Sequence, residues 1–591
     1  MLLIESIYTK LLTHPNCRHK RFLPFWNDII KEKAVPARRK IMFISGMTVE
    51  NYRTFQNVSF HFDSQVNYIV GDNNIGKSNF LSLLKSATHG YGFKEADFLD
   101  PDLPIRVTFD LTTKDEGGND SIRIELKQSV REIVPRLYNM DTGETLPLEY
   151  MRCLFCLDFA LSEIPKNMLD DNLAGRTISI FDEYLSYGPE AVEEVERMMN
   201  ERGFSISLPK DDPHKAALVL FGEIFGAQIS GTSYDSTMKL MIAVGVSLLV
   251  LMREKRESRA ISFENIIMTK NDGTRLLPVI VNIDEPELHL HPYLQRALLA
   301  FCRSILNNKE SFFLKLVQNL LGVDGLDGQL FVVTHSTDAL VNDYRKIIRM
   351  YRDEKEMVRA ACGSSFHFDS EIEKHLIMHF PEVKEALYSR CTILVEGETE
   401  YGSFGYFAKT LGVQFDYHGI CLINARGESS ISKIAELIRR FHIPAVCLYD
   451  RDVMGSRHHS SYVFYTDYIC FEMDVVKSCL SHGKRKLLDD VIGDIEEAGD
   501  VVSSALIKKA GAKLGVPKGF YPPKKLKNIN PRDEKAQEFY YFAWLYGNKG
   551  VIIGRALGKR LTENEIPPAF ARTIHAAVRF SAGNKGQSGE K

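Results

Sequence analysis

A glycine-rich loop constrains the fold of this chain more than any other feature of its sequence. The loop is Gly71-Asp-Asn-Asn-Ile-Gly76-Lys77-Ser78, and it follows the apolar run 66–70. Such a loop binds phosphate when a strand enters it and a helix leaves it, because backbone N–H groups and the helix dipole then point at the anion. The sequence therefore predicts a strand, loop and helix unit that holds ATP and Mg²⁺. The predicted nucleotide contacts in the loop are Gly71, Asn74, Gly76, Lys77 and Ser78.

Carboxylates far along the chain complete the predicted nucleotide site. Residues 276–283 form a mostly apolar run that ends in Asp284 and Glu285, as expected of a buried parallel strand that delivers acids to the sheet edge where ligands bind. We expect Asp284 to hold Mg²⁺ and Glu285 to polarise the attacking water. A second buried strand, 329–334, ends in His335, which we expect to orient the γ-phosphate.

These residues resemble the ABC-type ATPases of the SMC and Rad50 kind, especially stand-alone relatives with the sequence found here at Asp284-Glu-Pro-Glu-Leu-His-Leu-His-Pro292. The resemblance implies two ATPase domains that hold nucleotide between them, with a signature loop of one protomer completing the site of the other. The candidate signature is Ile229-Ser230-Gly231-Thr232-Ser233, which departs from the usual Leu-Ser-Gly-Gly-Gln. Residues 164–225 form either an insertion at a protomer interface or an ordinary helical lobe.

A second group of acids follows another pair of predicted strands, between residues 391 and 452. One strand ends at Glu396 and is followed by a helix that carries Glu400. The other ends at Asp450, with Asp452 two residues later. Because the carboxyl ends of parallel strands share one edge of a sheet, we expect these acids to meet. Clustered carboxylates repel one another, and a divalent cation with oxygen ligands, Mg²⁺ or Mn²⁺, is the usual remedy.

This spacing resembles the Toprim domain, in which a Glu follows one strand and Asp-x-Asp follows another. An ABC-type ATPase followed by Toprim resembles the OLD (overcoming lysogenization defect) family, which includes the nuclease subunit of Gabija defence. The resemblance covers roughly residues 42–573 and implies carboxylates that bind two metal ions and cut or nick DNA, with help from a late lysine. By this resemblance the metal-binding and catalytic positions are Glu396, Glu400, Asp450, Asp452 and Glu472, with Lys549 as the lysine and Lys559 as its alternative.

Composition and length limit the class of protein. A chain of 591 residues is too long for one core. The formal net charge of −3 means that nucleic-acid binding would need a local basic surface. No apolar run reaches the ~20 residues that span a bilayer, and the longest candidate, 238–252, is expected to be a buried helix. Ten cysteines, mostly single, and the lack of a secretory leader predict a reduced, cytoplasmic protein.

The predicted architecture is α/β throughout. Its predicted parts are a basic extension at 1–40, an ABC-type ATPase domain at 41–380, a Toprim domain with C-terminal helices at 381–580 and a disordered tail at 581–591. The basic extension is a nucleic-acid arm, a solvated extension or sequence upstream of the true start.

Together these features predict an ATP-regulated, metal-dependent DNA endonuclease of bacterial antiphage defence. Pairing of ATPase domains implies a homo-oligomer, and a helicase or a reverse transcriptase with its nucleic acid is a further partner class. Basic residues at 484–486, 508–509 and 524–527 are either contacts to the DNA backbone or solvated surface. The main alternative is a non-cleaving SMC/Rad50-like ATPase that senses or organises DNA, although no long heptad region separates the ATPase halves.

Overall fold

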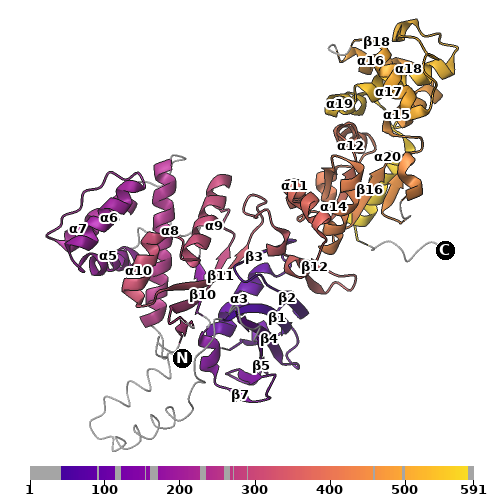
Figure 1. The fold of residues 1–591 in the computed structure, drawn as a ribbon. Helices are drawn as coiled ribbons and strands as arrows, with labels where there is room; N and C mark the ends of the chain where they lie inside the picture. Colours follow the sequence, from indigo (N-terminus) through magenta and orange to yellow (C-terminus); the bar gives the residue numbers. More distant parts are fainter. Residues whose placement is uncertain are drawn as a thin grey trace, which may run out of the picture.

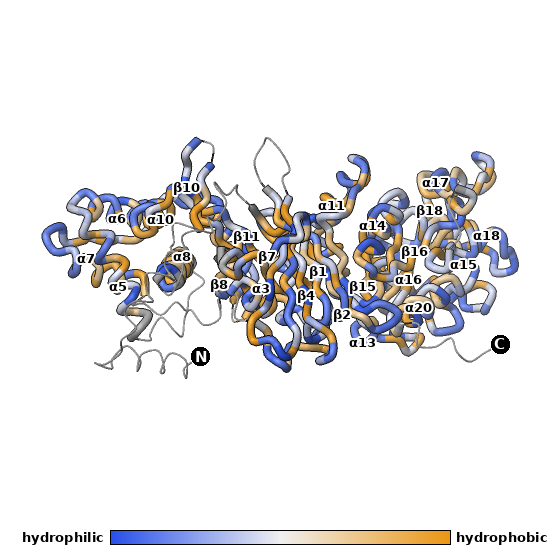
Figure 2. Tube along the Cα trace, turned by 90° about the horizontal axis from the view of Figure 1, so that it is seen from below, coloured by the Kyte–Doolittle hydropathy of each residue, from blue (hydrophilic) through white to orange (hydrophobic). Residues whose placement is uncertain are grey.

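The chain folds into two α/β units that follow one another along an elongated molecule (Figures 1 and 2). A computed structural model describes residues 42–89, 92–113, 121–153, 155–159, 171–225, 234–257, 266–270, 272–288, 290–456, 460–495 and 499–583. The predicted basic extension, the candidate signature with Ser230 and most of the predicted tail lie outside these residues.

The first unit opens with an antiparallel sheet, in the order β2-β1-β4-β5-β6-β7. Burial alternates from residue to residue along β5, as in a half-buried strand. The strands are β1 (Met42–Tyr52), β2 (Phe55–His61), β4 (Ile105–Thr113), β5 (Ser121–Gln128), β6 (Arg136–Asn139) and β7 (Thr145–Leu146).

A second, mainly parallel sheet carries the phosphate loop, in the order β13-β12-β3-β11-β10-β8, with β9 beside β10. Its central strands are apolar and buried along most of their length because helices cover them. The strands are β3 (Val66–Gly71), β8 (Phe155–Phe159), β9 (Met268–Thr269), β10 (Arg275–Asp284), β11 (Gly325–Val333), β12 (Ile347–Arg352) and β13 (Val358–Cys362).

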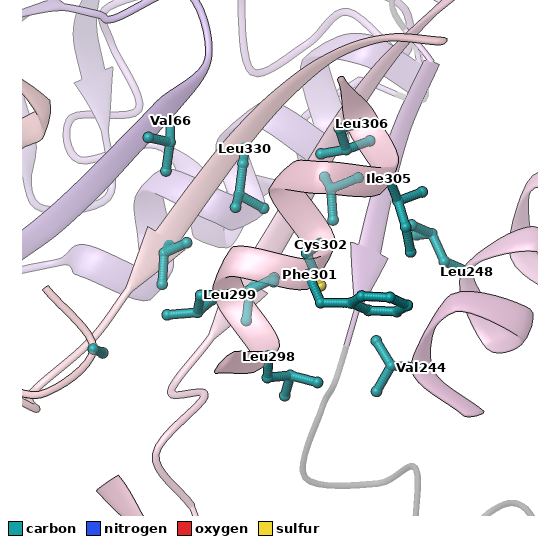
Figure 3. Close-up of a cluster of buried hydrophobic side chains, with 14 of the residues drawn as sticks. Val66, Val244, Leu248, Leu298, Leu299, Phe301, Cys302, Ile305, Leu306 and Leu330 are labelled. Carbon is teal, nitrogen blue, oxygen red and sulfur yellow. The ribbon is translucent and has the colours of Figure 1, made fainter. Parts of the chain in front are cut away.

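Helices cover this sheet and extend from it as a lobe (Figure 1). Figure 3 shows Leu298, Leu299 and Phe301 among side chains of the strands and of a neighbouring helix. Apolar segments follow the strands of both units, whereas hydrophilic ones lie on outer loops (Figure 2). The helices are α3 (Lys77–His89), α5 (Asp171–Leu185), α6 (Pro189–Glu201), α7 (Pro213–Phe225), α8 (Tyr234–Glu257), α9 (Pro292–Leu306), α10 (Ser311–Leu321) and α11 (Ser370–Ala386).

Helices α8 and α6 of the first unit differ in how much of their surface is buried. The segment 238–252 lies within α8 and is mostly buried, as expected. In the acidic helix α6, Val192, Val195 and Met199 are buried in the core, so only the acidic face of the helix is solvated. Among the described residues, no helix has the length and apolar character needed to cross a bilayer.

The second unit is a parallel sheet with helices on both sides and a helical C-terminal part. Its strand order is β15-β14-β16-β17, with a short β18–β19 ribbon further along. The strands are β14 (Cys391–Val395), β15 (Ile420–Asn424), β16 (Ala445–Tyr449), β17 (Val463–Tyr465), β18 (Val501–Val502) and β19 (Lys524–Lys525). The helices are α12 (Glu398–Thr410), α13 (Phe415–His418), α14 (Glu428–Arg440), α15 (Phe471–Ser481), α16 (Arg485–Gly493), α17 (Ser504–Leu514), α18 (Glu534–Gly547), α19 (Val551–Arg560) and α20 (Pro568–Ser581).

The junction between the units is a packed interface. Helix α11 continues through Pro381, so no break in secondary structure marks the predicted boundary at 380/381. One hydrophobic cluster includes Leu376 of α11 and Ile438 of α14. The ring of Tyr351 stacks on His442 with centroids 4.3 Å apart.

Arg349 of β12 is the polar centre of this junction. Arg349 is only 5% exposed, and its guanidinium donates to the carbonyl oxygens of Leu387 at 3.1 Å and Ser389 at 3.3 Å. It also donates to the carbonyls of Phe441 at 3.1 Å and His442 at 3.4 Å. Burial lowers the pKa of Arg349 to about 10, so the group stays charged at neutral pH. A buried cation therefore holds backbone segments of the second unit against the first sheet.

Replacing Arg349 by Met should uncouple the two units. The substitution keeps an unbranched side chain but removes hydrogen bonds to a charged group, worth on the order of 1.5–3 kcal/mol each, partly offset because no charge is then buried. We expect calorimetry to resolve a separate, lower unfolding transition for the second unit. Arg352→Met, at the exposed end of the same strand, should leave the profile unchanged. An unaltered profile for Arg349→Met would show that apolar packing alone joins the units.

Candidate functional site

The phosphate loop lies between β3 and α3, as the sequence predicts. Gly71 has a φ of +144°, and a Cβ there would come within 2.3 Å of the Met350 carbonyl oxygen, so this position requires glycine. Helix α3 begins at Lys77, which places Lys77 and Ser78 in its first turn. The Lys77 ammonium donates to the carbonyl oxygens of Gly71 at 3.0 Å and Asp72 at 2.7 Å. It is thus held over the loop.

The structure brings the acids of β10 to this loop. Burial lowers the pKa of Lys77, against the opposing charges of Asp72, Glu285 and Asp284. Burial also raises the pKa of Asp284, although a hydrogen bond from Ser78 opposes the shift. The residues predicted to hold ATP and its cation therefore come together, from segments about two hundred residues apart.

Glu285 and His335 also face each other, across 3.8 Å between Oε1 and Nε2. Glu285 has a φ of +47°, a conformation that is uncommon for a residue with a side chain and that aims it out of the strand. Sequence reasoning missed Glu287. Its carboxylate accepts hydrogen bonds from the Thr334 hydroxyl at 2.7 Å and the His335 N–H at 2.6 Å. The available signal was a third acid two residues after the Asp-Glu pair.

The second group of acids gathers at the carboxyl edge of the second sheet. Strands β14 and β16 are parallel neighbours, so Glu396 and Asp450 leave the sheet side by side. Glu400 lies in the first turn of α12, where its Oε2 approaches to 2.8 Å of the position a Cβ at Gly397 would take. The Phe471 N–H donates to the Asp450 carboxylate at 3.3 Å.

The charges of these acids act on one another's pKa values. Burial, together with the charges of Glu472 and Glu396, raises the pKa of Glu400 to about 8. Burial raises the pKa of Asp450 to about 9, with contributions from Glu400, Glu396 and Glu472. Burial also raises the pKa of Glu396. Acids that raise one another's pKa at this level share a poorly solvated space with excess negative charge.

Glu472 and Asp474 have different environments. Both are buried in the first turn of α15. Asp474 accepts the backbone N–H groups of Asp467 at 2.8 Å and Tyr468 at 2.6 Å, so it holds the local turn. Glu472 instead acts on the pKa of Glu400 and Asp450.

Lysines approach the acids from α17 and from the turn before α19. The pKa of Lys549 is raised, since the charges of Glu472, Glu400 and Asp450 outweigh its burial. Lys559 lies near the end of α19, where its charge acts on Asp494. Lys513, which sequence reasoning missed, forms an ion pair with Asp452. Arg485 of the basic segment 484–486 instead donates to the Leu526 and Ile529 carbonyls.

The acids fit a divalent metal ion by their chemistry. Carboxylate oxygens are the hard donors that Mg²⁺ and Mn²⁺ prefer, and a cation would relieve the repulsion that raises their pKa values. Among the residues that the structure describes, no three carboxylate, imidazole or thiol groups stand close enough together to hold a metal as they are. The donors that would hold it are Glu396, Glu400, Asp450, Asp452 and Glu472.

Comparisons with known proteins recognise the two units separately. Residues 42–128 and 251–339 match the AAA ATPase domain, and residues 387–452 match the TOPRIM domain of the overcoming lysogenization defect protein-like family. These matches confirm the predicted fold class, an ATPase domain followed by a Toprim domain with a parallel sheet.

Individual relatives are distant. The Old nuclease of Escherichia phage P2 is 23% identical over 196 residues, a match that covers 32% of this chain and only 30% of that relative. A structure of the SmcHead bound to the C-winged helix domain of ScpA is 14% identical with a TM-score of 0.32, covering 54% of this chain and 96% of the other. The C-terminal region of the Xanthomonas campestris pv. campestris OLD protein is 17% identical with a TM-score of 0.23, covering 34% of this chain and 96% of the other.

The raised pKa values of Glu400 and Asp450 predict a loss of stability with rising pH when divalent cations are chelated. Both groups are protonated in the folded protein near neutral pH but ionise near pH 4 when unfolded. The stabilisation is therefore complete below about pH 4 and is lost as pH rises through about 8 to 9. In EDTA, we expect the melting temperature to fall over this range, by about 2–4 °C for each kcal/mol.

The variant Glu400→Gln with Asp450→Asn cannot ionise at these positions, so its melting temperature should fall less and exceed that of wild type at about pH 9. Asp416→Asn, an exposed acid on α13, is the matched control and should follow wild type. Parallel curves for the double variant and wild type would contradict the electrostatic account.

Proposed function

The chain is an OLD-family protein with an AAA ATPase domain and an OLD-like Toprim domain, and on that basis we propose that it is an ATP-regulated, divalent-metal-dependent DNA endonuclease of antiphage defence. The observation that carries the proposal is the buried group of acids at the edge of the second sheet, with Lys549 beside it. Structural acids are usually paired or solvated, whereas mutually repelling buried acids are typical of a site that binds a cation.

In the proposed reaction, water adds across one P–O bond of a phosphodiester, leaving a phosphomonoester and a hydroxyl. A divalent cation, when bound, supplies Lewis acidity for this hydrolysis. The carboxylates of Glu396, Glu400, Asp450, Asp452 and Glu472 are its proposed ligands. Lys549 places a positive charge where the negative charge of the pentavalent phosphorus develops, and burial strengthens that interaction.

Contacts between the two domains support regulation by ATP. The Tyr388 hydroxyl, at the start of the Toprim domain, donates to the carbonyl oxygens of Thr334 at 3.5 Å and Ser336 at 3.3 Å. These residues flank His335, which Glu287 anchors beside the nucleotide site. A shift of this segment on nucleotide binding would therefore act directly on Tyr388 and the Toprim domain.

The proposed partners follow from the proposed nuclease function. DNA is the substrate, and paired ATPase domains would make the protein a dimer or tetramer. A helicase, or a reverse transcriptase with its nucleic acid, is the proposed class of defence partner. Lys524, Lys525 and Lys527 lie together near the β18–β19 ribbon, with Lys525 and Lys527 exposed, and they suit contacts to a DNA backbone.

Asp450→Asn should abolish metal-dependent nicking. The substitution keeps the size of the side chain but removes a charged ligand, so we expect plasmid nicking in Mg²⁺ or Mn²⁺ to fall by about 10²–10³-fold, comparable with the loss of one transition-state contact. Gel analysis of supercoiled plasmid measures it, with Asp416→Asn as the matched control. Nicking retained by Asp450→Asn would remove the catalytic assignment. A wild type that nicks no DNA would favour the non-cleaving ATPase that senses or organises DNA.

Glu287→Gln should separate nucleotide binding from its effect on nicking. The amide oxygen can still accept the His335 N–H, but the Thr334 hydroxyl must then accept from the amide NH2 instead of donating to a carboxylate, and the negative charge of this anchor is lost. We expect ATP affinity, measured with a fluorescent analogue, to stay within about threefold, a cost of less than one hydrogen bond, while nicking no longer responds to ATP. Lys77→Ala should lose both binding and response. A full ATP response in Glu287→Gln would exclude this route.

A further inference from the structure

The aromatic ring of Tyr546, near the end of α18, collects positive charge beside the acids. The ammonium groups of Lys549, Lys509 and Lys513 lie 5.0, 5.3 and 6.0 Å from its centroid. The ring itself stacks on Phe542, with centroids 5.2 Å apart. Cations over an aromatic face are attracted by its negative quadrupole, which offsets part of their mutual repulsion. We call Lys509, Lys513 and Lys549 the Tyr546 lysine cluster.

The packing of α17 against α18 places this cluster. A Cβ at Gly547 would lie 2.2 Å from the Leu506 side chain, so the glycine lets α17 approach the end of α18 closely. Lys513 lies in the last turn of α17, and Gly515, in a left-handed conformation, caps the helix. The cluster therefore combines Lys509 and Lys513 of α17 with Lys549 of the turn before α19, which tertiary packing brings together.

Lys513 and Lys549 act on overlapping sets of acids. Lys513 forms an ion pair with Asp452, and their side chains are 20% and 37% exposed. Its charge also lowers the pKa of Glu396 and Asp450. Lys549 acts on Glu400 and Glu396. The centroid of the Tyr546 ring lies within 6.0 Å of both ammonium groups, so the ring contacts the two lysines that act on these acids.

We infer that Lys513 competes with a divalent cation for Asp452 and, once displaced, joins Lys509 and Lys549 in binding a phosphodiester of a nucleic-acid backbone. A cation on Asp452 would repel the neighbouring ammonium, and the flexible stem of lysine lets that group turn away while it stays near the ring. Anionic oxygens are the acceptors that an ammonium released beside two others would bind. This inference rests on the proposed nuclease function and adds a residue that couples metal binding to substrate binding.

The test compares wild type with Lys513→Met and Lys513→Gln in the full chain. Removing a competing charge should tighten Mn²⁺ binding, measured by electron paramagnetic resonance of free Mn²⁺, by about 2- to 5-fold, the range of an exposed ion pair. The same variants should bind a short fluorescent single-stranded oligonucleotide more weakly in Ca²⁺. Their salt dependence should have a log–log slope smaller by about 0.7, the value for one lost phosphate contact on a single strand.

Opposite changes in the two affinities are the signature of the inference, because a merely structural lysine would weaken both or neither. Lys513→Arg keeps the positive charge, so it should bind the oligonucleotide as wild type does. Lys535 is an exposed lysine on α18, and Lys535→Met should match wild type in both assays. Lys513→Gln guards against misfolding, since its amide can still donate to Asp452.

Distinct outcomes overturn the inference and the proposed function. If wild type binds Mn²⁺ and oligonucleotide and the Lys513 variants match it, the inference fails and the nuclease proposal stands. If wild type binds neither, both fail. If inorganic phosphate competes with the oligonucleotide at equal phosphate concentration, the cluster binds a free phosphate and the assignment to a nucleic-acid backbone is overturned.

Discussion

The buried guanidinium of Arg349 is the interaction on which the arrangement of the two domains depends. Removing a cation from water is costly, and the carbonyl oxygens of Leu387, Ser389 and Phe441 compensate for that loss. Arg349 lies on β12 beside β3, where Met350 pairs with Gly71 of the phosphate loop. One strand thus contacts both the phosphate loop and the backbone of the Toprim domain.

The acidic site illustrates how function and stability compete. Glu400 and Asp450 are buried close to like charges, which favours their protonated forms and costs folding free energy once they ionise. The Tyr546 lysine cluster supplies the compensating charge from one side, and Lys513 reaches Asp452 directly. A divalent cation at such a site would relieve the repulsion among the acids.

Much of the fold and of the candidate site could be predicted from the sequence, because local pattern encodes it. The glycines of the phosphate loop, the apolar strand before Asp284 and the acids after β14 and β16 each carry their signal within about ten residues. Parallel strands then place those acids at one edge. The roles of Glu287 and Lys513 could not be predicted in this way, since their partners His335 and Asp452 lie 48 and 61 residues away. Local sequence shows that Glu287 follows the Asp-Glu pair, but it does not show which groups either side chain contacts.

The sequence by itself determined the order of the two domains, the strand that enters each site and the identity of the acids at the strand ends, because hydrophobic periodicity and loop glycines act over short distances. Only the tertiary structure decided which charges meet. The shift of Asp450 to a pKa of about 9, the contacts of Arg349 and the pairing of Lys513 with Asp452 all depend on burial and on distances across the chain. Those quantities exist only after packing has removed water from between the groups.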